Sequence, residues 1–87
     1  MTYRVNIKPI AQRYLKKLSI SLQIRITQKL KGLETNPRQG AKKLQDYNNR
    51  YRIRMGDYRI IYEIHDNILV VIVVEIGHRS DIYRRKK

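Results

Sequence analysis

Two alternating runs on either side of Gly56-Asp57 constrain the fold of this chain more than any other feature. In RYRIRMGDYRIIYEI, residues 50–64, apolar and polar side chains largely alternate before and after the Gly-Asp pair. A period of two is typical of strands with one buried face, and a glycine-containing pair between two such runs is a hairpin signal. The sequence therefore predicts an antiparallel hairpin closed by a two-residue loop.

A two-residue loop also fixes which residues of the hairpin face one another. The predicted pairs are Met55 with Tyr58, Arg54 with Arg59, Arg52 with Ile61, and Arg50 with Glu63. One face is then filled by Tyr51, Ile53, Met55, Tyr58, Ile60, Tyr62 and Ile64. Arg54 opposite Arg59 is destabilising in isolation and is best relieved by an anion between them. The alternative is a solvated face on which Arg50 pairs with Glu63.

The first half of the chain is predicted to form a strand and a helical hairpin. Tyr3–Lys8 alternates enough for a strand, and Pro9 suits the first turn of a helix. The apolar residues expected on one face of that helix are Ile10, Tyr14, Leu15 and Leu18. Ser19 or Ser21 can cap a second helix. Its apolar stripe is Leu22, Ile26, Leu30 and Leu33.

After a loop marked by Asn36, Pro37 and Gly40 the pattern becomes β. Strands are predicted over Tyr51–Met55, Tyr58–Ile64 and Ile68–Ile76, with Asp66-Asn67 joining the last two. The last strand is apolar almost throughout, as expected for a central strand. The order β-α-α-β-β-β predicts an α+β fold with an N-terminal strand, a helical hairpin, and a mainly antiparallel sheet covered by helices on one face. At 87 residues, one domain over residues 1–87 is expected.

The net charge of +13, from 20 Lys and Arg against 7 Asp and Glu, favours a polyanionic partner such as nucleic acid or an acidic protein. Residues 1–43 hold 11 basic residues and 1 acidic residue, whereas residues 44–83 hold 5 basic and 6 acidic residues. The arginines of the hairpin therefore lie in a stretch that is not basic overall. We infer that these arginines occupy specific positions for a purpose and do not merely reflect a high overall content of basic residues.

Composition also limits the kinds of site. The absence of cysteine excludes disulfides and thiolate metal sites, and two histidines far apart make a poor metal set, so we expect no metal and no cofactor. The start MTYRVNIK lacks the apolar run of a signal peptide, and ILVVIVV, residues 68–74, is too short to span a bilayer. We expect a cytoplasmic protein with no membrane partner.

The C-terminal stretch GHRSDIYRRKK, residues 77–87, holds a second candidate cluster. Gly77 is expected to end the central strand. After it come His78, Arg79, the Ser80-Asp81 pair, which can start a helical turn, and Tyr83. The central strand is expected to neighbour Tyr58–Ile64, so its exit lies near Arg59. A cationic, aromatic pocket can therefore form where Arg59, Arg79 and Tyr83 converge. The alternatives are a half-buried tyrosine at the sheet edge and a surface histidine.

These blocks resemble the RelE/ParE superfamily of type II toxin-antitoxin toxins over nearly the whole chain: the helical hairpin, then YRIRMGDYRIIYEI, then VVEIGHRSDIYRR. The chain looks most like the RelE branch, which consists of ribosome-dependent mRNA endoribonucleases. Two alternating basic residues before the turn are matched by Arg52 and Arg54. An arginine after the turn tyrosine is matched by Arg59, an arginine after the central strand by Arg79, and a C-terminal tyrosine by Tyr83. Some relatives have lysines at the positions of Arg52 and Arg54. They also have a longer spacing between the arginine and the tyrosine that correspond to Arg79 and Tyr83.

The resemblance implies a metal-independent reaction in which a 2′-OH attacks the neighbouring phosphorus and leaves 2′,3′-cyclic phosphate and 5′-OH ends. Arginine suits the charge on the phosphorane but, with a pKa above about 12, is a poor base. The residues implied in catalysis are Arg52, Arg54, Arg59, Arg79 and Tyr83, with His78 a candidate base by elimination. The residues expected to bind RNA are Lys16, Lys17, Lys29, Arg50, Arg84 and Arg85.

The partners implied by the resemblance are a cognate antitoxin, in a toxin-antitoxin hetero-oligomer, and the ribosome with its mRNA. The alternative is a binding protein, either a DNA gyrase inhibitor of the ParE kind or an RNA-binding module without catalysis. In that alternative Arg79 and Tyr83 are dispensable.

Overall fold

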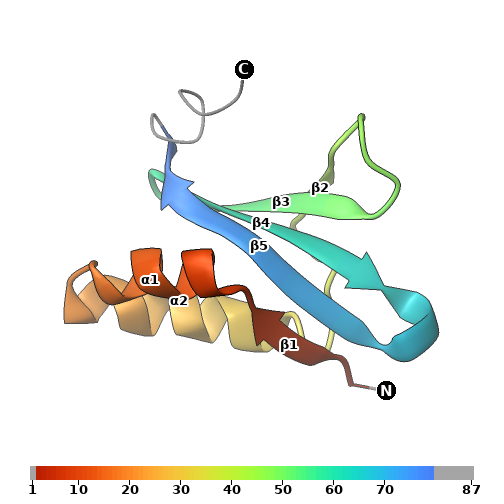
Figure 1. Ribbon diagram of the computed structural model, residues 1–87, viewed down its shortest axis with the longest axis horizontal. Helices are drawn as coiled ribbons and strands as arrows, with labels where there is room; N and C mark the ends of the chain where they lie inside the picture. Colours follow the sequence, from red (N-terminus) through yellow and green to blue (C-terminus); the bar gives the residue numbers. More distant parts are fainter. Residues whose placement is uncertain (1, 80–87) are drawn as a thin grey trace.

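The computed structural model describes residues 2–79. The elements in chain order are β1 (Arg4–Ile7), α1 (Pro9–Lys16), α2 (Ile20–Gly32), β2 (Lys42–Lys43), β3 (Arg50–Met55), β4 (Tyr58–His65), a 3-10 turn (Asp66–Ile68) and β5 (Val70–His78). The strands form one sheet in the order β1-β5-β4-β3-β2, in which β1 is parallel to β5 and the other neighbours are antiparallel. Figure 1 shows both helices on one side of this sheet. The predicted α+β fold is confirmed.

The predicted register of the β3–β4 hairpin is also confirmed. The structure pairs Met55 with Tyr58, Arg54 with Arg59, Arg52 with Ile61, and Arg50 with Glu63. Gly56 has φ of +59°, which a two-residue hairpin loop requires and which glycine adopts without steric cost. A short loop of fixed geometry therefore sets the face on which every arginine of the hairpin lies.

The core lies between the two helices and the sheet. It is formed by Ala11, Ile26, Leu30, Leu33, Ile53, Ile60, Tyr62, Ile64, Val71, Val73 and Ile76. The prediction that Ile10 faces the core was wrong: its side chain is 53% exposed, whereas Ala11 is 1% exposed. The stripe of α1 that packs on the core begins at Ala11 and continues with the half-buried Tyr14 and Leu15, which are three and four residues later. The half-buried Leu18, seven residues after Ala11, follows the end of the helix.

Several element boundaries differ from the sequence-based expectation. Ile68 was expected to begin the last strand, but it lies in the 3-10 turn, and β5 begins at Val70 after Leu69 at φ of +53°. Gly77 was expected to end that strand, which runs on to His78. The edge strand β2 was not predicted because two exposed lysines give no alternation. Ser19 rather than Ser21 caps α2, and its Oγ accepts from the backbone N–H of Leu22 at 3.3 Å.

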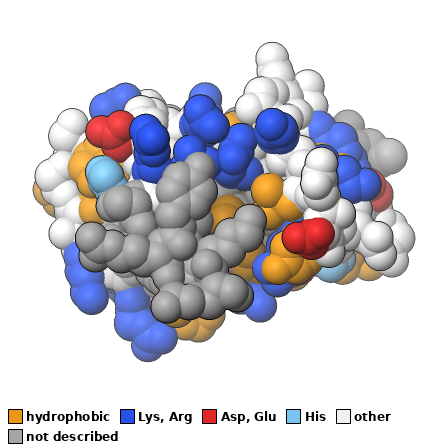
Figure 2. All heavy atoms as spheres, turned by 90° about the horizontal axis from the view of Figure 1, so that it is seen from above, with side chains coloured by type: hydrophobic (Ala, Val, Ile, Leu, Met, Phe, Trp, Pro, Cys, Tyr) orange, Lys and Arg blue, Asp and Glu red, His pale blue; other side chains and the backbone are white. Residues whose placement is uncertain are grey.

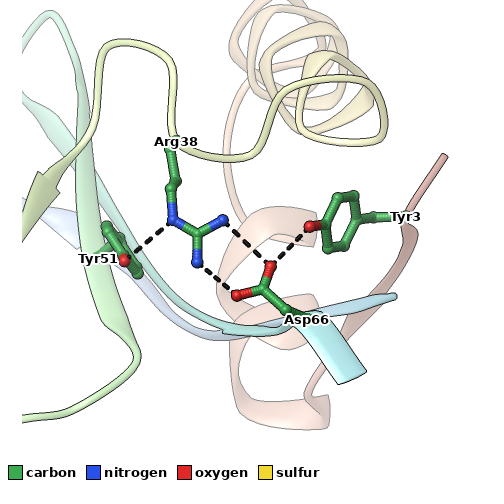
Figure 3. A network of polar contacts seen from close by, with 4 residues as sticks. All are labelled: Tyr3, Arg38, Tyr51 and Asp66. Atoms are coloured by element: carbon green, nitrogen blue, oxygen red, sulfur yellow. Dashed lines mark hydrogen bonds and ion pairs between the residues drawn. The ribbon is translucent and has the colours of Figure 1, made fainter. Parts of the chain in front are cut away.

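A polar network links the loop after α2 to the turn between β4 and β5 (Figure 3). Arg38 donates through Nη1 and Nη2 to the two carboxylate oxygens of Asp66, at 3.1 and 2.6 Å, and through Nε to the hydroxyl of Tyr51 at 3.2 Å. Tyr3 donates to Asp66 Oδ1 at 2.6 Å. The hydrogen bonds from Arg38 and Tyr3 lower the pKa of Asp66 to about 2. This network joins the residue before β1, the loop after α2, β3 and the β4–β5 turn.

A second, buried contact holds the same loop. The hydroxyl of Tyr62 donates to the carbonyl oxygen of Pro37 at 2.6 Å, and burial raises the pKa of this tyrosine to about 12.

No helix within residues 2–79 is both long enough and apolar enough to cross a membrane.

Candidate functional site

The sheet face that points away from α1 and α2, here called the open face, carries the arginines of the hairpin. Across the sheet its residues form rows. One row contains Arg54, Arg59 and Gly77, and the next contains Lys42, Arg52, Ile61 and Glu75. Figure 2 looks onto this side of the molecule and shows Lys and Arg side chains gathered beside an apolar area. The predicted arrangement, in which the arginines lie opposite the core, is present.

Arg54 and Arg59 face each other but differ in burial. Arg54 is exposed, whereas Arg59 is 5% exposed. A buried guanidinium loses hydration and is retained only where its surroundings compensate for the loss. Arg59 is therefore a positioned charge rather than part of a solvated surface.

Arg79 lies at the same end of the open face. Its backbone N–H donates to the carbonyl oxygen of Asp57 at 2.8 Å, which fixes the exit of β5 against the β3–β4 turn. Its side chain is exposed. The structure thus brings Arg79 close to the turn that joins Arg54 and Arg59. Tyr83, Arg84 and Arg85 lie outside the described residues.

His78 lies on the other face of the sheet. It pairs with Tyr58, the two rings meet edge to face with centroids 5.4 Å apart, and the backbone N–H of His78 donates to the hydroxyl of Tyr14 at 2.9 Å. The candidate base is therefore separated from the arginines by the sheet. The cause is a register shift between Ile61 and Tyr62, which makes Gly77 rather than Ile76 the partner of Arg59 and turns His78 toward the helices.

Farther along the open face, Arg50 is part of an ion-pair cluster. Its Nε and Nη2 each lie 3.0 Å from Glu63 Oε2, and His65 Nε2 lies 3.0 Å from Glu63 Oε1. Burial raises the pKa of Glu63, but the hydrogen bonds from His65 and Arg50 outweigh it and hold the pKa below its ordinary value. The guanidinium of Arg50 also lies over the ring of Tyr47, 4.4 Å from its centroid. Sequence patterns did not single out Tyr47 or His65.

The predicted basic residues of the helical hairpin lie on a separate surface. Lys16 ends α1, Lys17 follows it, and Lys29 lies in the last turn of α2; all three are exposed.

Residues 2–79 contain no group of three or more His, Cys, Asp or Glu side chains placed to hold a metal ion.

A protein family and several sequence relatives match this chain over most of its length. Residues 5–83 match the family described as ParE toxin of type II toxin-antitoxin system, parDE. The chain is 32% identical over 87 residues to toxin RelG of Mycobacterium tuberculosis, covering 98% of this chain and 100% of RelG. It is 29% identical over 87 residues to the mRNA interferase toxin RelE of Escherichia coli, covering 95% of this chain and 92% of RelE.

Solved structures show the same relationship. A chain of the archaeal RelE–RelB complex from Pyrococcus horikoshii matches with a TM-score of 0.82 and 29% identity, over 92% of this chain and 98% of that chain. A chain of the intact Escherichia coli RelBE toxin-antitoxin complex matches with a TM-score of 0.79 and 27% identity, over 87% of this chain and 95% of that chain. The chain belongs to the RelE/ParE superfamily and is a RelE-like toxin of the type II toxin-antitoxin class.

Proposed function

We propose that this toxin is a ribosome-dependent mRNA endoribonuclease that uses the Arg54–Arg59 end of the open face as its active site. The observation that carries the proposal is that an exposed and a buried arginine lie directly opposite one another, with Arg79 anchored beside their turn. Like charges that face each other across two strands oppose pairing, and an anion between them relieves the conflict. The name of the Escherichia coli relative, an mRNA interferase, supports mRNA as that anion.

The proposed reaction is a transfer within the RNA strand. The 2′ oxygen attacks the adjacent phosphorus and loses its proton, the bond from phosphorus to the 5′ oxygen breaks, and that oxygen takes up a proton. The products are a 2′,3′-cyclic phosphate and a 5′-OH end. Charge accumulates on the phosphorane oxygens, and the planar fork of arginine can hold two of them at once. Arg59 and Arg79 take this role, with Arg54 and Arg52 positioning the strand.

Arginine cannot act as the base at neutral pH, because its pKa lies above about 12. His78 faces the helices, so we leave it out of the proposed site. We propose instead that the ribosome holds the 2′-OH, the phosphorus and the leaving oxygen in line, because orientation can supply about 7–11 kcal/mol. Tyr83, which lies outside the described residues, is proposed to stack on the neighbouring base or to contribute its hydroxyl.

The proposed partners follow from charge and from the relatives. The exposed lysines Lys16, Lys17 and Lys29 would contact ribosomal RNA phosphates. Two of the matched structures are toxin-antitoxin complexes, which supports an antitoxin that covers the open face in a hetero-oligomer. Because translation is the target, we propose that the toxin acts in the cytoplasm.

One paired assay separates this proposal from the alternative that the family description ParE favours, namely inhibition of DNA gyrase. Purified toxin is added to a translating extract and, separately, to a gyrase supercoiling reaction. The proposal expects new mRNA ends by primer extension and unchanged supercoiling. Intact mRNA together with blocked supercoiling would make the protein a gyrase inhibitor. Ribosome binding with neither effect would leave a non-catalytic RNA-binding protein.

A further inference from the structure

We propose that Tyr47 and Arg50 form a stacking platform for one unpaired RNA base, on the open face but away from the Arg54–Arg59 pair. The inference rests on the proposed function, because it describes how the same face would hold the strand that is cut. Its test below is a binding measurement, so that it can fail or succeed separately from cleavage.

The platform is a tyrosine ring backed by a fixed guanidinium. Tyr47 lies in the loop between β2 and β3, with 46% of its surface exposed. Arg50 lies over this ring, and its Nε and Nη2 each contact Glu63 Oε2 at 3.0 Å. Because moving the guanidinium would break two charge-assisted contacts, the cationic side of the stack is held in place before any ligand arrives.

The same contacts determine the chemistry that Arg50 offers. Its charge is balanced by Glu63, whose other oxygen lies 3.0 Å from His65 Nε2. Arg50 is therefore a weak phosphate ligand, and what it contributes is a planar surface behind the ring. An aromatic ring with one face supported by a cation and nearly half its surface in solvent fits the face of a nucleobase. Only an unstacked base can reach it, so the ligand is single-stranded.

Tyr47 also differs in kind from the other exposed apolar residues. The large apolar side chains that the structure leaves most exposed within residues 2–79 are Ile10, Ile20, Ile24, Tyr47 and Ile68. Four of these five are aliphatic, and three belong to α1 and α2. Tyr47 is the aromatic member of this set, and its partner Arg50 projects from the open face.

The position of the platform matches a strand that runs along β3. Arg50 and Arg54 are four residues apart on the same strand face, which corresponds to about 13 Å. Between them lies Arg52, with Lys42 as its neighbour on β2. A single strand of RNA can therefore place a phosphate at the Arg54–Arg59 pair, contact Arg52 and Lys42, and lay a base on Tyr47.

The test measures the affinity of the toxin for a short, fluorescently labelled single-stranded RNA at low salt, and for copies with one abasic nucleotide at successive positions. We expect Tyr47→Ala to weaken binding by about ten-fold or more, and Tyr47→Phe to bind like the wild type. Tyr47→Leu keeps apolar volume without a ring and should bind as weakly as the alanine variant. Ile20→Ala, at a residue that is 70% exposed on α2, is the matched control and should have no effect.

The abasic copies locate the base. For the wild type, removal of the base at one position should reduce the affinity much more than removal at the others. For Tyr47→Ala, removal of that base should reduce the affinity no further, because the two changes remove one interaction. Tyr47→Ala or Tyr47→Leu with wild-type affinity, or an unchanged abasic profile, overturns the inference even if the toxin cleaves mRNA. A Tyr47-dependent profile in a toxin that never cleaves supports the platform and refutes the nuclease proposal. No binding of single-stranded RNA at low salt refutes the platform.

Discussion

Arg54 and Arg59 lie directly opposite one another across β3 and β4, one exposed and the other 5% exposed. Nothing in the apolar core requires either side chain, since the buried apolar residues of both strands project to the helix-covered face. Facing like charges are in general unfavourable for strand pairing, and an anion bound between them would lower that cost.

Arg54→Thr should separate stability from activity. Threonine suits an exposed strand position and removes the like charge opposite Arg59, so the free energy of unfolding should rise by about 0.5 kcal/mol. Cleavage of ribosome-bound mRNA should fall. Urea unfolding followed by circular dichroism measures the first effect, and primer extension measures the second.

Arg4→Thr is the matched control for that variant. Arg4 is an exposed arginine on β1, and its partner in the sheet is Val70 rather than another arginine. The substitution should give no comparable gain in stability and no loss of cleavage. Equal gains in the two variants would mean that strand propensity, not charge opposition, explains the result.

Arg79→Ala should abolish cleavage and leave the fold and ribosome affinity nearly intact. The contact that anchors Arg79 is a backbone N–H donated to Asp57 at 2.8 Å, which survives truncation of the side chain. A group that acts only in the transition state affects rate more than binding. Single-turnover cleavage and ribosome co-sedimentation should be compared. A proportional loss of both would make Arg79 a docking residue.

Ribosome binding should weaken steeply with salt, because each phosphate that the protein neutralises releases a counterion. Charge reversal at Lys16, Lys17 and Lys29 should reduce both the affinity and its salt dependence without moving the cut site. Filter binding over a range of potassium concentrations, with primer extension in parallel, tests this. Salt-independent binding would rule out the electrostatic account.

Stability should depend on acid pH through Asp66. Hydrogen bonds from Arg38 and Tyr3 hold its pKa at about 2 in the folded protein, below the ordinary value of 3.8. The stabilisation is thus fully present above about pH 4 and is lost as the pH falls through about 2. Asp66→Asn should reduce the slope of unfolding free energy against pH in this window, whereas Asp46→Asn, in the exposed loop before β3, should preserve it. The same slope in wild type and Asp66→Asn would contradict the network of Figure 3.

The hairpin register could be predicted from sequence because it depends on local information. Alternation fixes the buried face, and a two-residue loop leaves one register that puts the apolar residues together, so the position of Arg54 opposite Arg59 follows. The helices were predictable for the same reason, apart from Ile10, whose size suggested a core role that Ala11 holds.

The side on which His78 lies could not be predicted, because one extra residue in β5 decides it. Without the shift beside Ile61, continued alternation from Val71 and Val73 would have put His78 on the open face. Such a bulge cannot be recognised from the sequence of a strand that is apolar almost throughout, because there is no alternation of apolar and polar residues for it to interrupt. The contact of Arg38 with Asp66 was equally inaccessible, since it joins residues 28 positions apart through tertiary packing. Tyr47 has no periodic signal because it lies in a loop.

The most direct test of the account uses programmed ribosomes and two mRNAs that differ only at the nucleotide 5′ to the cut, which is a ribonucleotide in one and a 2′-deoxynucleotide in the other. Purified toxin, free of antitoxin, should release fragments with 5′-OH ends from the first mRNA and leave the second intact at that position. Equal cleavage of both mRNAs would contradict 2′-OH attack, and no fragments from either would contradict the nuclease assignment itself.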